Sequence, residues 1–280
     1  MRRVEGKTAF ITGAARGQGR SHAQRLAGEG AHIIAVDICD QIQGVAYDMA
    51  TYDDLRETQK LVEMAGGRIL IEKADVRDAG SLEKVVAQGL AEFGSIDIVC
   101  ANAGISSYGK TWELSESSWQ DTIDVNLTGV WHTIKAVVPS MIDAGRGGSI
   151  IITSSSAALV GIPTLSHYTA AKTGLLGLAR SLAQELGEHY IRVNTIHPTG
   201  VDTRMAINDY AFRLFMPDIE NPTRDDASQL FRSMNILPVP WVKPADISNA
   251  VLWLASDESR YVTGAAIPID AGVSQKYPGG

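Results

Sequence analysis

The sequence has few of the residues that mark several common classes of protein. Only Cys39 and Cys100 are cysteines among 280 residues, and their spacing is not typical of a metal site. Lysine and arginine number 25 against 32 aspartates and glutamates, so the net charge of −7 gives no field that attracts nucleic acid or anionic lipid. No apolar run approaches the length of a membrane span, and the N-terminus has no leader-like segment. We therefore expect a cytoplasmic protein without metal, nucleic-acid or membrane partners.

Linkers and internal repeats are also missing. No low-complexity stretch divides the chain, so a second domain has no place to begin. One α/β domain of this length buries enough apolar surface to fold without disulfides. We expect residues 1–280 to form a single domain.

Seven short apolar runs alternate with longer helical segments. Their continuous apolar character is typical of strands that helices cover on both faces. The alternation predicts an α/β fold of the Rossmann type, with a seven-stranded parallel sheet and helices on both faces. The predicted strands are 8–11, 32–36, 68–71, 96–100, 149–153, 191–196 and 265–269, and the clearest helices are 19–28, 81–93 and 168–186.

Two segments interrupt this alternation. Residues 38–53 follow the second strand without a clear period until a helix begins at Tyr52, and they exceed the usual strand-to-helix connection. Residues 204–243 precede the last long helix and supply apolar walls for a substrate pocket, although helix packing explains any single one of them equally well. These apolar residues are Met205, Phe212, Leu214, Phe215, Met216, Phe231, Met234 and Trp241.

A glycine-rich loop, TGAARGQG at 12–19, joins the first strand to a helix. Glycines let the backbone turn sharply and approach a pyrophosphate, and the helix N-terminus offers free N–H groups and a positive dipole end. Three glycines among 27 are weak evidence alone, but the strand–loop–helix context favours a dinucleotide site. The expected contacts are Gly13, Ala15, Arg16, Gly17, Gln18 and Gly19.

Asp37 ends the second predicted strand, 18 residues after Gly19. A carboxylate there accepts hydrogen bonds from the adenosine ribose and repels a 2′-phosphate, which indicates NAD rather than NADP. Arg16 argues mildly for a phosphate, but it is also simply a solvated loop residue. Asp75 and Val76 follow the third strand and are expected at the adenine ring, although an ordinary strand-end turn is an alternative. Asn102, Ala103 and Gly104 follow the fourth strand and are also expected to contact the cofactor.

Tyr168 and Lys172 lie one helical turn apart on the same predicted face. A free tyrosine, with a pKa of ~10, is a poor acid–base catalyst at neutral pH, and a nearby ammonium lowers that value. Ser155 ends the fifth strand, where its hydroxyl is able to polarise a carbonyl oxygen. Such a pair alone is more often an ordinary surface pair, so the other landmarks decide its meaning.

Together these landmarks resemble the classical short-chain dehydrogenase/reductase family over essentially the whole chain. The matching residues are TGAARGQG, Asp37, Asp75, Asn102-Ala103-Gly104, Asn126 in VNLTG, Ser155, Tyr168, Lys172 and 198–203. The resemblance implies hydride exchange between NAD and an alcohol or ketone. Tyr168 would be the general acid/base, Lys172 would bind the nicotinamide ribose and lower the tyrosine pKa, and Ser155 would orient the substrate oxygen.

The resemblance also assigns residues outside the central pair. Asn126 would hold a water that passes protons from Lys172 to solvent, although its plain interpretation is a polar residue inside a helix. Thr203 would meet the nicotinamide carboxamide or the pyrophosphate, next to Pro198, Gly200 and Val201. A homotetramer is implied, with 121–142, 168–186 and 245–269 as its contact faces.

Two departures from the family pattern narrow the resemblance. The usual N-N-A-G is Ala101-Asn102-Ala103-Gly104 here, and the usual P-G turn is Pro198-Thr199-Gly200. With the 38–53 insertion, they resemble the carveol-dehydrogenase-like, mycofactocin-associated subfamily. That implies a tightly held NAD, with mycofactocin as external redox carrier. The insertion leaves the strand directly after Asp37, so we expect it to cover the adenosine end of the cofactor; the alternative is that it packs on its own helix and touches no cofactor.

A hydrophobic, ring-sized secondary alcohol, such as a carveol-like terpenoid, is the expected substrate. Its expected contacts are Ser155, Tyr168, Tyr108, Trp112, Thr199 and Met205; His167, beside Tyr168, is expected to face away from the site. Two alternatives remain: an NADPH-linked ketoreductase, against which Asp37 argues, and a non-catalytic NAD-binding sensor, against which the complete tetrad argues.

Overall fold

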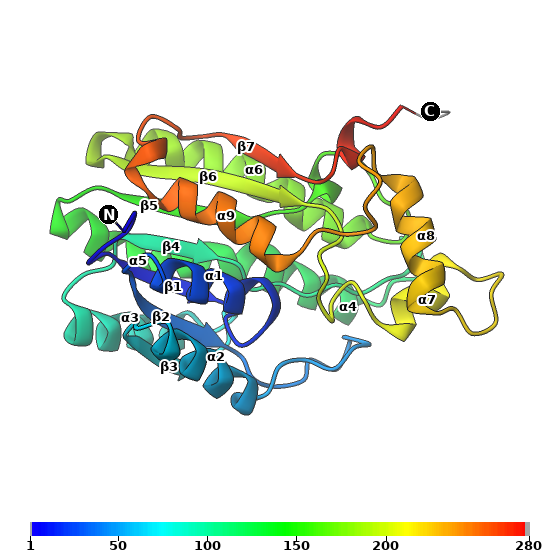
Figure 1. Cartoon of the computed structure of the whole chain (residues 1–280), viewed down its shortest axis with the longest axis horizontal. Helices are drawn as coiled ribbons and strands as arrows, with labels where there is room; N and C mark the ends of the chain where they lie inside the picture. Colours follow the sequence, from blue (N-terminus) through cyan, green and yellow to red (C-terminus); the bar gives the residue numbers. More distant parts are fainter. Residues whose placement is uncertain (1, 278–280) are drawn as a thin grey trace.

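Seven parallel strands form one sheet in the computed structural model, which describes residues 2–277 (Figure 1). Their order is β3-β2-β1-β4-β5-β6-β7, so the chain winds outward in both directions from the β1–β4 pair. The predicted sheet is confirmed. The strands are β1 (Thr8–Thr12), β2 (His32–Asp37), β3 (Ile69–Lys73), β4 (Ile98–Ala101), β5 (Gly148–Thr153), β6 (Ile191–Pro198) and β7 (Ala266–Ile269).

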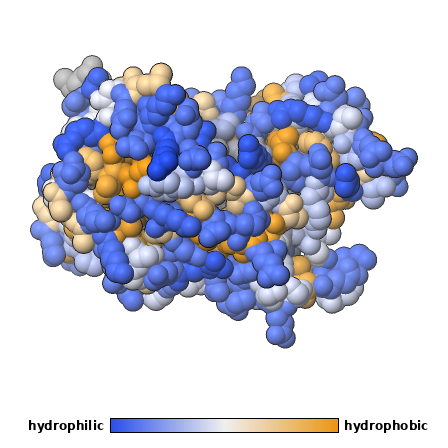
Figure 2. All heavy atoms as spheres, turned by 90° about the horizontal axis from the view of Figure 1, so that it is seen from below, coloured by the Kyte–Doolittle hydropathy of each residue, from blue (hydrophilic) through white to orange (hydrophobic). Residues whose placement is uncertain are grey.

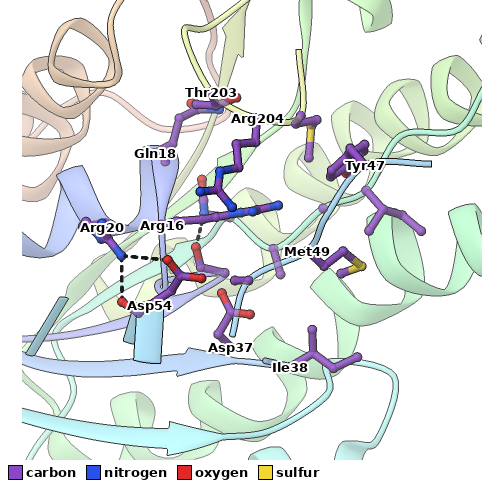
Figure 3. A pocket seen from close by; sticks show the side chains of 18 of the residues that line it. Arg16, Gln18, Arg20, Asp37, Ile38, Tyr47, Met49, Asp54, Thr203 and Arg204 are labelled. Atoms are coloured by element: carbon purple, nitrogen blue, oxygen red, sulfur yellow. Dashed lines mark hydrogen bonds and ion pairs between the residues drawn. The ribbon is translucent and has the colours of Figure 1, made fainter. Parts of the chain in front are cut away.

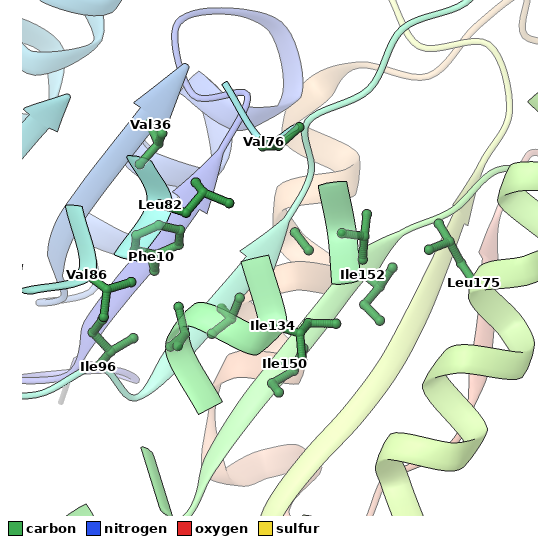
Figure 4. Close-up of a cluster of buried hydrophobic side chains, with 14 of the residues drawn as sticks. Phe10, Val36, Val76, Leu82, Val86, Ile96, Ile134, Ile150, Ile152 and Leu175 are labelled. Atoms are coloured by element: carbon green, nitrogen blue, oxygen red, sulfur yellow. The ribbon is translucent and has the colours of Figure 1, made fainter. Parts of the chain in front are cut away.

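The strands are apolar on both faces because helices cover both faces. In β1, Phe10 packs into one hydrophobic cluster, while Ala9 and Ile11 pack into the other. The Phe10 cluster joins the sheet to α3 (Ala79–Phe93), α5 (Gly129–Ala144) and α6 (Ser166–Leu186), and part of it is seen in Figure 4. The opposite cluster joins the sheet to α1 (Gly17–Ala27), α2 (Tyr52–Met64) and α9 (Pro244–Ala255).

The predicted strand limits differ from the observed ones by up to two residues. The third strand begins at Ile69 and runs to Lys73, and the fourth begins at Ile98 rather than at Ile96. Ile96 is 2% exposed, so its apolar character reflects burial beneath the sheet rather than a place in the strand ladder. An apolar run therefore predicts which residues are buried more accurately than it predicts where the hydrogen-bonded strand begins and ends.

The segment predicted as a helix over 121–142 is divided. It consists of the end of α4 (Glu116–Ile123), a π-helical turn (Asp124–Thr128) and α5. Asn126 lies in that turn, where the changed hydrogen-bonding pattern locally alters the direction of the side chains.

The loops at the carboxyl edge of the sheet carry the two interrupting segments. The insertion ends where α2 begins at Tyr52, as predicted, because Thr51 and Asp54 form a capping box. The 204–243 segment folds into α7 (Asp209–Phe215) and α8 (Arg224–Met234). Both segments extend past the arrowheads of the strands in Figure 1. Among residues 2–277, no helix has the length and apolar character to span a bilayer.

Candidate active site

Two adjoining cavities lie at the carboxyl edge of the sheet, the position where open α/β sheets bind ligands. The larger has a volume of about 470 Å³ and extends from the glycine loop to the insertion. The smaller, of about 180 Å³, contains the side chains of Ser155, Tyr168 and Lys172 in its wall. The residues that line both are Gln18, Asn102, Gly104, Thr203 and Met205.

The glycine loop packs directly against the turn after β4. Gly13 has a φ of +66°, and a Cβ at this position would lie 2.8 Å from the Cα of Ala103. Thr12 fixes the contact, because its Oγ1 accepts hydrogen bonds from the backbone N–H groups of Asn102 and Ala103, both at 3.1 Å. Only glycine fits at position 13, and the backbone therefore forms the cavity floor.

Asp37 lines the large cavity and is held by the backbone. Its carboxylate accepts hydrogen bonds from the N–H groups of Ala15 at 3.0 Å and Cys39 at 3.1 Å. Burial raises the pKa of this carboxyl group, while the two N–H bonds act in the opposite direction. A carboxylate so positioned keeps free lone pairs for hydroxyl donors.

Arg16 bonds to the insertion. Its Nη2 donates to the backbone carbonyl of Asp48, whereas its buried Nη1 has no partner within residues 2–277. Figure 3 shows the Arg16 and Arg204 side chains close together across the cavity from Asp37. The simple solvated-loop interpretation of Arg16 is wrong, because its guanidinium joins the glycine loop to the insertion.

The insertion forms a wall of the large cavity. Its lining residues are Ile38, Ile42, Tyr47, Met49 and Ala50. Tyr47 is 8% exposed, and its phenolic oxygen accepts a hydrogen bond from the N–H of Ser106 at 3.3 Å. Burial raises the pKa of Tyr47 to about 12. Gln41 braces the loop internally, since its Nε2 donates to the Val45 carbonyl at 2.9 Å and its Oε1 accepts from Met49 N–H at 3.0 Å.

The other expected cofactor residues fall into two groups. Those that line a cavity are Gly13, Arg16, Gly17, Gln18, Asp37, Asp75, Val76, Asn102, Ala103, Gly104, Pro198, Gly200, Val201 and Thr203. Ala15 and Gly19 do not; Ala15 donates to Asp37, and a Cβ on Gly19 would lie 2.1 Å from the Gly13 carbonyl oxygen. The Asp75 carboxylate is paired with Arg77, with Nη2 at 2.7 Å, so it is also part of the strand-end turn.

The catalytic helix α6 brings Tyr168 and Lys172 to the small cavity. The Lys172 Nζ lies 5.6 Å from the centre of the Tyr168 ring and donates to the Thr153 carbonyl at 2.9 Å. Burial lowers the pKa of Lys172 to about 7. Burial also raises the pKa of Tyr168 above its usual value, and a contact with Ser155 lowers it only in part.

The expected lowering of the Tyr168 pKa by Lys172 is therefore not seen in this structure. The physical reason is desolvation: the lysine is 2% exposed, and the burial that lowers its pKa to about 7 weakens its positive charge near neutral pH.

Asn126 lies behind the cavity wall and does not line it. It is fully buried, and its Nδ2 donates to the carbonyls of Ile105 at 3.0 Å and Thr122 at 2.9 Å. A Cβ on Gly104 would lie 2.9 Å from Asn126 Oδ1 and 3.5 Å from Lys172 Nζ. Glycine at 104 thus lets the asparagine and the lysine approach each other.

One expected substrate contact is wrong. Trp112 is 81% exposed and lines neither cavity, because residues 111–113 form a turn facing solvent. Tyr108, Thr199 and Met205 do line the small cavity. His167 instead bonds to Ser107 Oγ, with Nε2 at 2.7 Å.

The sequence offered two roles for the apolar residues of 204–243, as walls of a substrate pocket or as helix-packing residues, and the structure shows both. Met205, Phe215, Phe231 and Met234 line the small cavity. Phe212 and Met216 instead form a separate hydrophobic cluster with Ala227, against which Trp241 packs. Neither explanation covers the whole segment.

Some residues of the site carry no recognisable sequence signal. His197 is fully buried; its Nδ1 is 2.9 Å from the Ser155 carbonyl oxygen and its Nε2 is 2.8 Å from Thr195 Oγ1. Because a carbonyl only accepts, Nδ1 carries the hydrogen, and the ring fixes the backbone of Ser155. Thr153 acts through its main chain, which no side-chain pattern reveals.

Comparison with known proteins places this site in a family. The fold and the two cavities are those of an oxidoreductase that uses a dinucleotide. The family model described as enoyl-(acyl carrier protein) reductase matches residues 13–274. A (−)-trans-carveol dehydrogenase of Rhodococcus erythropolis is 50% identical over 277 residues, covering 99% of this chain and 100% of that protein.

Two solved structures of similar proteins support the same family assignment. Carveol dehydrogenase from Mycobacterium avium in complex with NAD has a TM-score of 0.97 at 54% identity, covering 99% of this chain and 100% of that one. A short chain dehydrogenase from Mycobacterium paratuberculosis bound to NAD has a TM-score of 0.90 at 46% identity, covering 98% and 100%. The chain belongs to the short-chain dehydrogenase/reductase family, and the resemblance seen in the sequence is confirmed.

Proposed function

We propose that this protein uses NAD to oxidise a hydrophobic, ring-sized secondary alcohol, of which carveol is an example. The observation that carries the proposal is the convergence of Ser155, Tyr168 and Lys172 in a small cavity that adjoins the larger cavity of Asp37. Two of the similar proteins are named carveol dehydrogenases, and two of the similar structures contain NAD.

The large cavity fits a dinucleotide. Its floor is bare backbone at Gly13, where a Cβ has no room, which suits the close approach of a pyrophosphate. Two buried polar atoms at its wall, Arg16 Nη1 and Gln18 Oε1, have no partner among residues 2–277. Asp37 supplies the acceptor for ribose hydroxyls.

Each catalytic side chain has a role in alcohol oxidation. When bound, NAD supplies the hydride acceptor. Ser155 and Tyr168 hold the substrate hydroxyl, and the Tyr168 oxygen removes its proton as the carbinol carbon becomes a carbonyl. Lys172, which donates to the Thr153 carbonyl, would hold the nicotinamide ribose and pass the proton toward solvent by way of Asn126.

Replacement of Asp37 by alanine should relax the preference for NAD. The change removes a buried carboxylate that would repel a 2′-phosphate and accept ribose hydrogen bonds. We expect the ratio of kcat/KM with NAD to that with NADP to fall at least ~10-fold, the effect of one lost charge-assisted hydrogen bond. Glu57→Ala, a charge loss at an exposed position on α2 outside the insertion, is the control. A native protein that already prefers NADP would contradict the assignment and favour the ketoreductase alternative.

The substrate class can be tested by NADH production with a panel of alcohols. We expect cyclic terpenoid secondary alcohols to be better substrates than short linear ones, since aromatic and aliphatic side chains form most of the small cavity's wall. NAD binding without turnover of any secondary alcohol would instead favour the sensor alternative.

The insertion provides the basis for a second part of the proposal. Because it forms a wall of the large cavity and is joined to the glycine loop through Arg16, we propose that it covers the adenosine end of NAD and slows its release. A retained NADH needs an external carrier to reoxidise it, and mycofactocin is the carrier that the subfamily resemblance implies.

A homotetramer is also proposed, with contact faces on α5, α6 and the α9–β7 segment. Trp131, on α5, is 46% exposed. On the other side from β7, seen in Figure 2, hydrophobic residues form separate patches among hydrophilic ones. Large exposed apolar side chains of this kind suit a subunit interface. Light scattering at micromolar concentration should give four times the chain mass of 30.0 kDa. A stable monomer would contradict this.

A further inference from the structure

Two buried polar atoms in the wall of the small cavity have no hydrogen-bond partner within the described chain. They are Ser106 Oγ and Asn235 Oδ1, in residues that are 6% and 5% exposed. Neither residue belongs to the catalytic group. An unpaired buried polar atom is costly, and native proteins pair nearly all of them with protein, water or ligand. The Ser106 hydroxyl also lies against the Tyr47 and Tyr108 side chains, so Asn235 Oδ1 is the atom that indicates a partner in the cavity.

The Asn235 amide has a defined orientation. Its Nδ2 donates to the Val239 carbonyl at 2.7 Å, and the reversed amide would place oxygen against oxygen. Oδ1 is consequently the free end of the side chain, and it is able only to accept. The partner must bring an O–H or N–H donor.

The acceptor is also held in place. Asn235 directly follows α8, and the next two residues, Ile236 and Leu237, both donate backbone hydrogen bonds of 3.0 Å to the Ala271 carbonyl. Lys276 Nζ donates to the Asn235 carbonyl at 3.3 Å. The C-terminal segment thus positions this asparagine, and a preorganised acceptor discriminates better than a mobile one.

The surroundings make this acceptor selective. Most of the other side chains around the cavity are apolar or aromatic, including Tyr108, Ile162, Leu165, Met205, Phe215 and Phe231. In such surroundings a hydrogen bond is strong and an unmatched acceptor is penalised. Sites built to pair a substrate hydroxyl reject analogues that lack it far more strongly than apolar pockets reject a missing methylene.

We propose that Asn235 is a specificity-determining residue that selects substrates with a second hydroxyl group. The preferred substrate is then a largely hydrocarbon diol, whose reacting carbinol lies at Ser155 and Tyr168 and whose other hydroxyl donates to Asn235 Oδ1. The inference rests on the proposed function, since it specifies the substrate of the same site.

The test compares kcat/KM for cyclohexanol with values for the 1,2-, 1,3- and 1,4-cyclohexanediols. In the native protein at least one diol should exceed cyclohexanol by about 10-fold or more, a modest part of the discrimination known for paired hydroxyls. Asn235→Leu should lose that preference while it retains activity on cyclohexanol. Ser233→Ala, at an exposed position near the end of α8, is the control and should keep the preference. The absence of any diol preference, or its survival in Asn235→Leu, would overturn the inference.

A binding measurement separates this inference from the proposed function. Calorimetry on Tyr168→Phe in the presence of NAD requires no turnover and should show tighter binding of the preferred diol than of cyclohexanol. If the native protein oxidises none of these alcohols but this difference persists, the proposed function is wrong and the diol site stands. Equal oxidation and equal binding of diols and cyclohexanol would reject the diol site alone.

Discussion

Tyr168→Phe should reduce turnover by at least ~100-fold, the lower range for the loss of a general acid/base. The substitution keeps the ring that lines the small cavity and removes only the hydroxyl that exchanges a proton with the substrate. NAD binding should survive, because the glycine loop and Asp37 are untouched. The measurements are kcat with a secondary alcohol and NAD affinity by calorimetry.

Two further variants sharpen this result. Tyr261→Phe makes the same change on a side chain that is 88% exposed, and should behave as the native protein. Lys172→Ala should lower both turnover and NAD affinity, since it removes the side chain that we propose binds the nicotinamide ribose. Tyr168→Phe activity within ~10-fold of native would be incompatible with its general acid/base role.

Shortening the insertion at residues 40–50 should convert a protein that retains NAD through purification into one that emerges without it. The deleted residues include Ile42, Tyr47 and Met49 in the cavity wall and the Asp48 carbonyl that binds Arg16. Since most differences in affinity between related complexes appear in the off-rate, the loss should be visible as faster release. The measurement is the NAD content of denatured protein, followed by exchange of labelled NAD.

A point substitution tests the same idea with less disturbance. Gln41→Ala removes the side chain that bonds to Val45 and Met49 within the loop and should accelerate NAD exchange. Gln59→Ala is the matched control, because that side chain contacts only Glu63 on the exposed face of α2. Native protein that purifies empty and exchanges NAD within seconds would refute the retention proposal.

Much of the fold follows from local pattern. Each strand with continuous apolar residues, such as 8–12, needs helices on both of its faces, and the alternation with helical segments then leaves a parallel sheet as the solution. The positions of Gly13, Asp37, Ser155, Tyr168 and Lys172 in the cavities were likewise predicted from their places at strand ends and on one helical face. The sheet and these site positions are therefore predictable from periodicity and strand order, without knowledge of long-range contacts.

Other features depended on contacts between distant segments. Trp112 follows a strand whose end reaches the site, yet the turn that carries it faces solvent. Arg16 was interpreted from its loop alone, whereas its partner is Asp48 in the insertion. The pKa of Tyr168 is raised, although its proximity to Lys172 on one helix suggested that it would be lowered. The reason is that burial affects both groups more strongly than their mutual attraction.

The class of fold, the nucleotide loop and the Tyr168–Lys172 pair on α6 were predictable from local pattern, because each depends on residues that are near in the chain or repeat with a regular period. Long-range packing was needed to show which apolar residues of 204–243 line the small cavity, that His197 holds the Ser155 backbone, and that Asn235 Oδ1 has no partner within residues 2–277. These properties arise where segments far apart in the chain meet. Their burial and hydrogen-bond partners exist only once the whole sheet has formed.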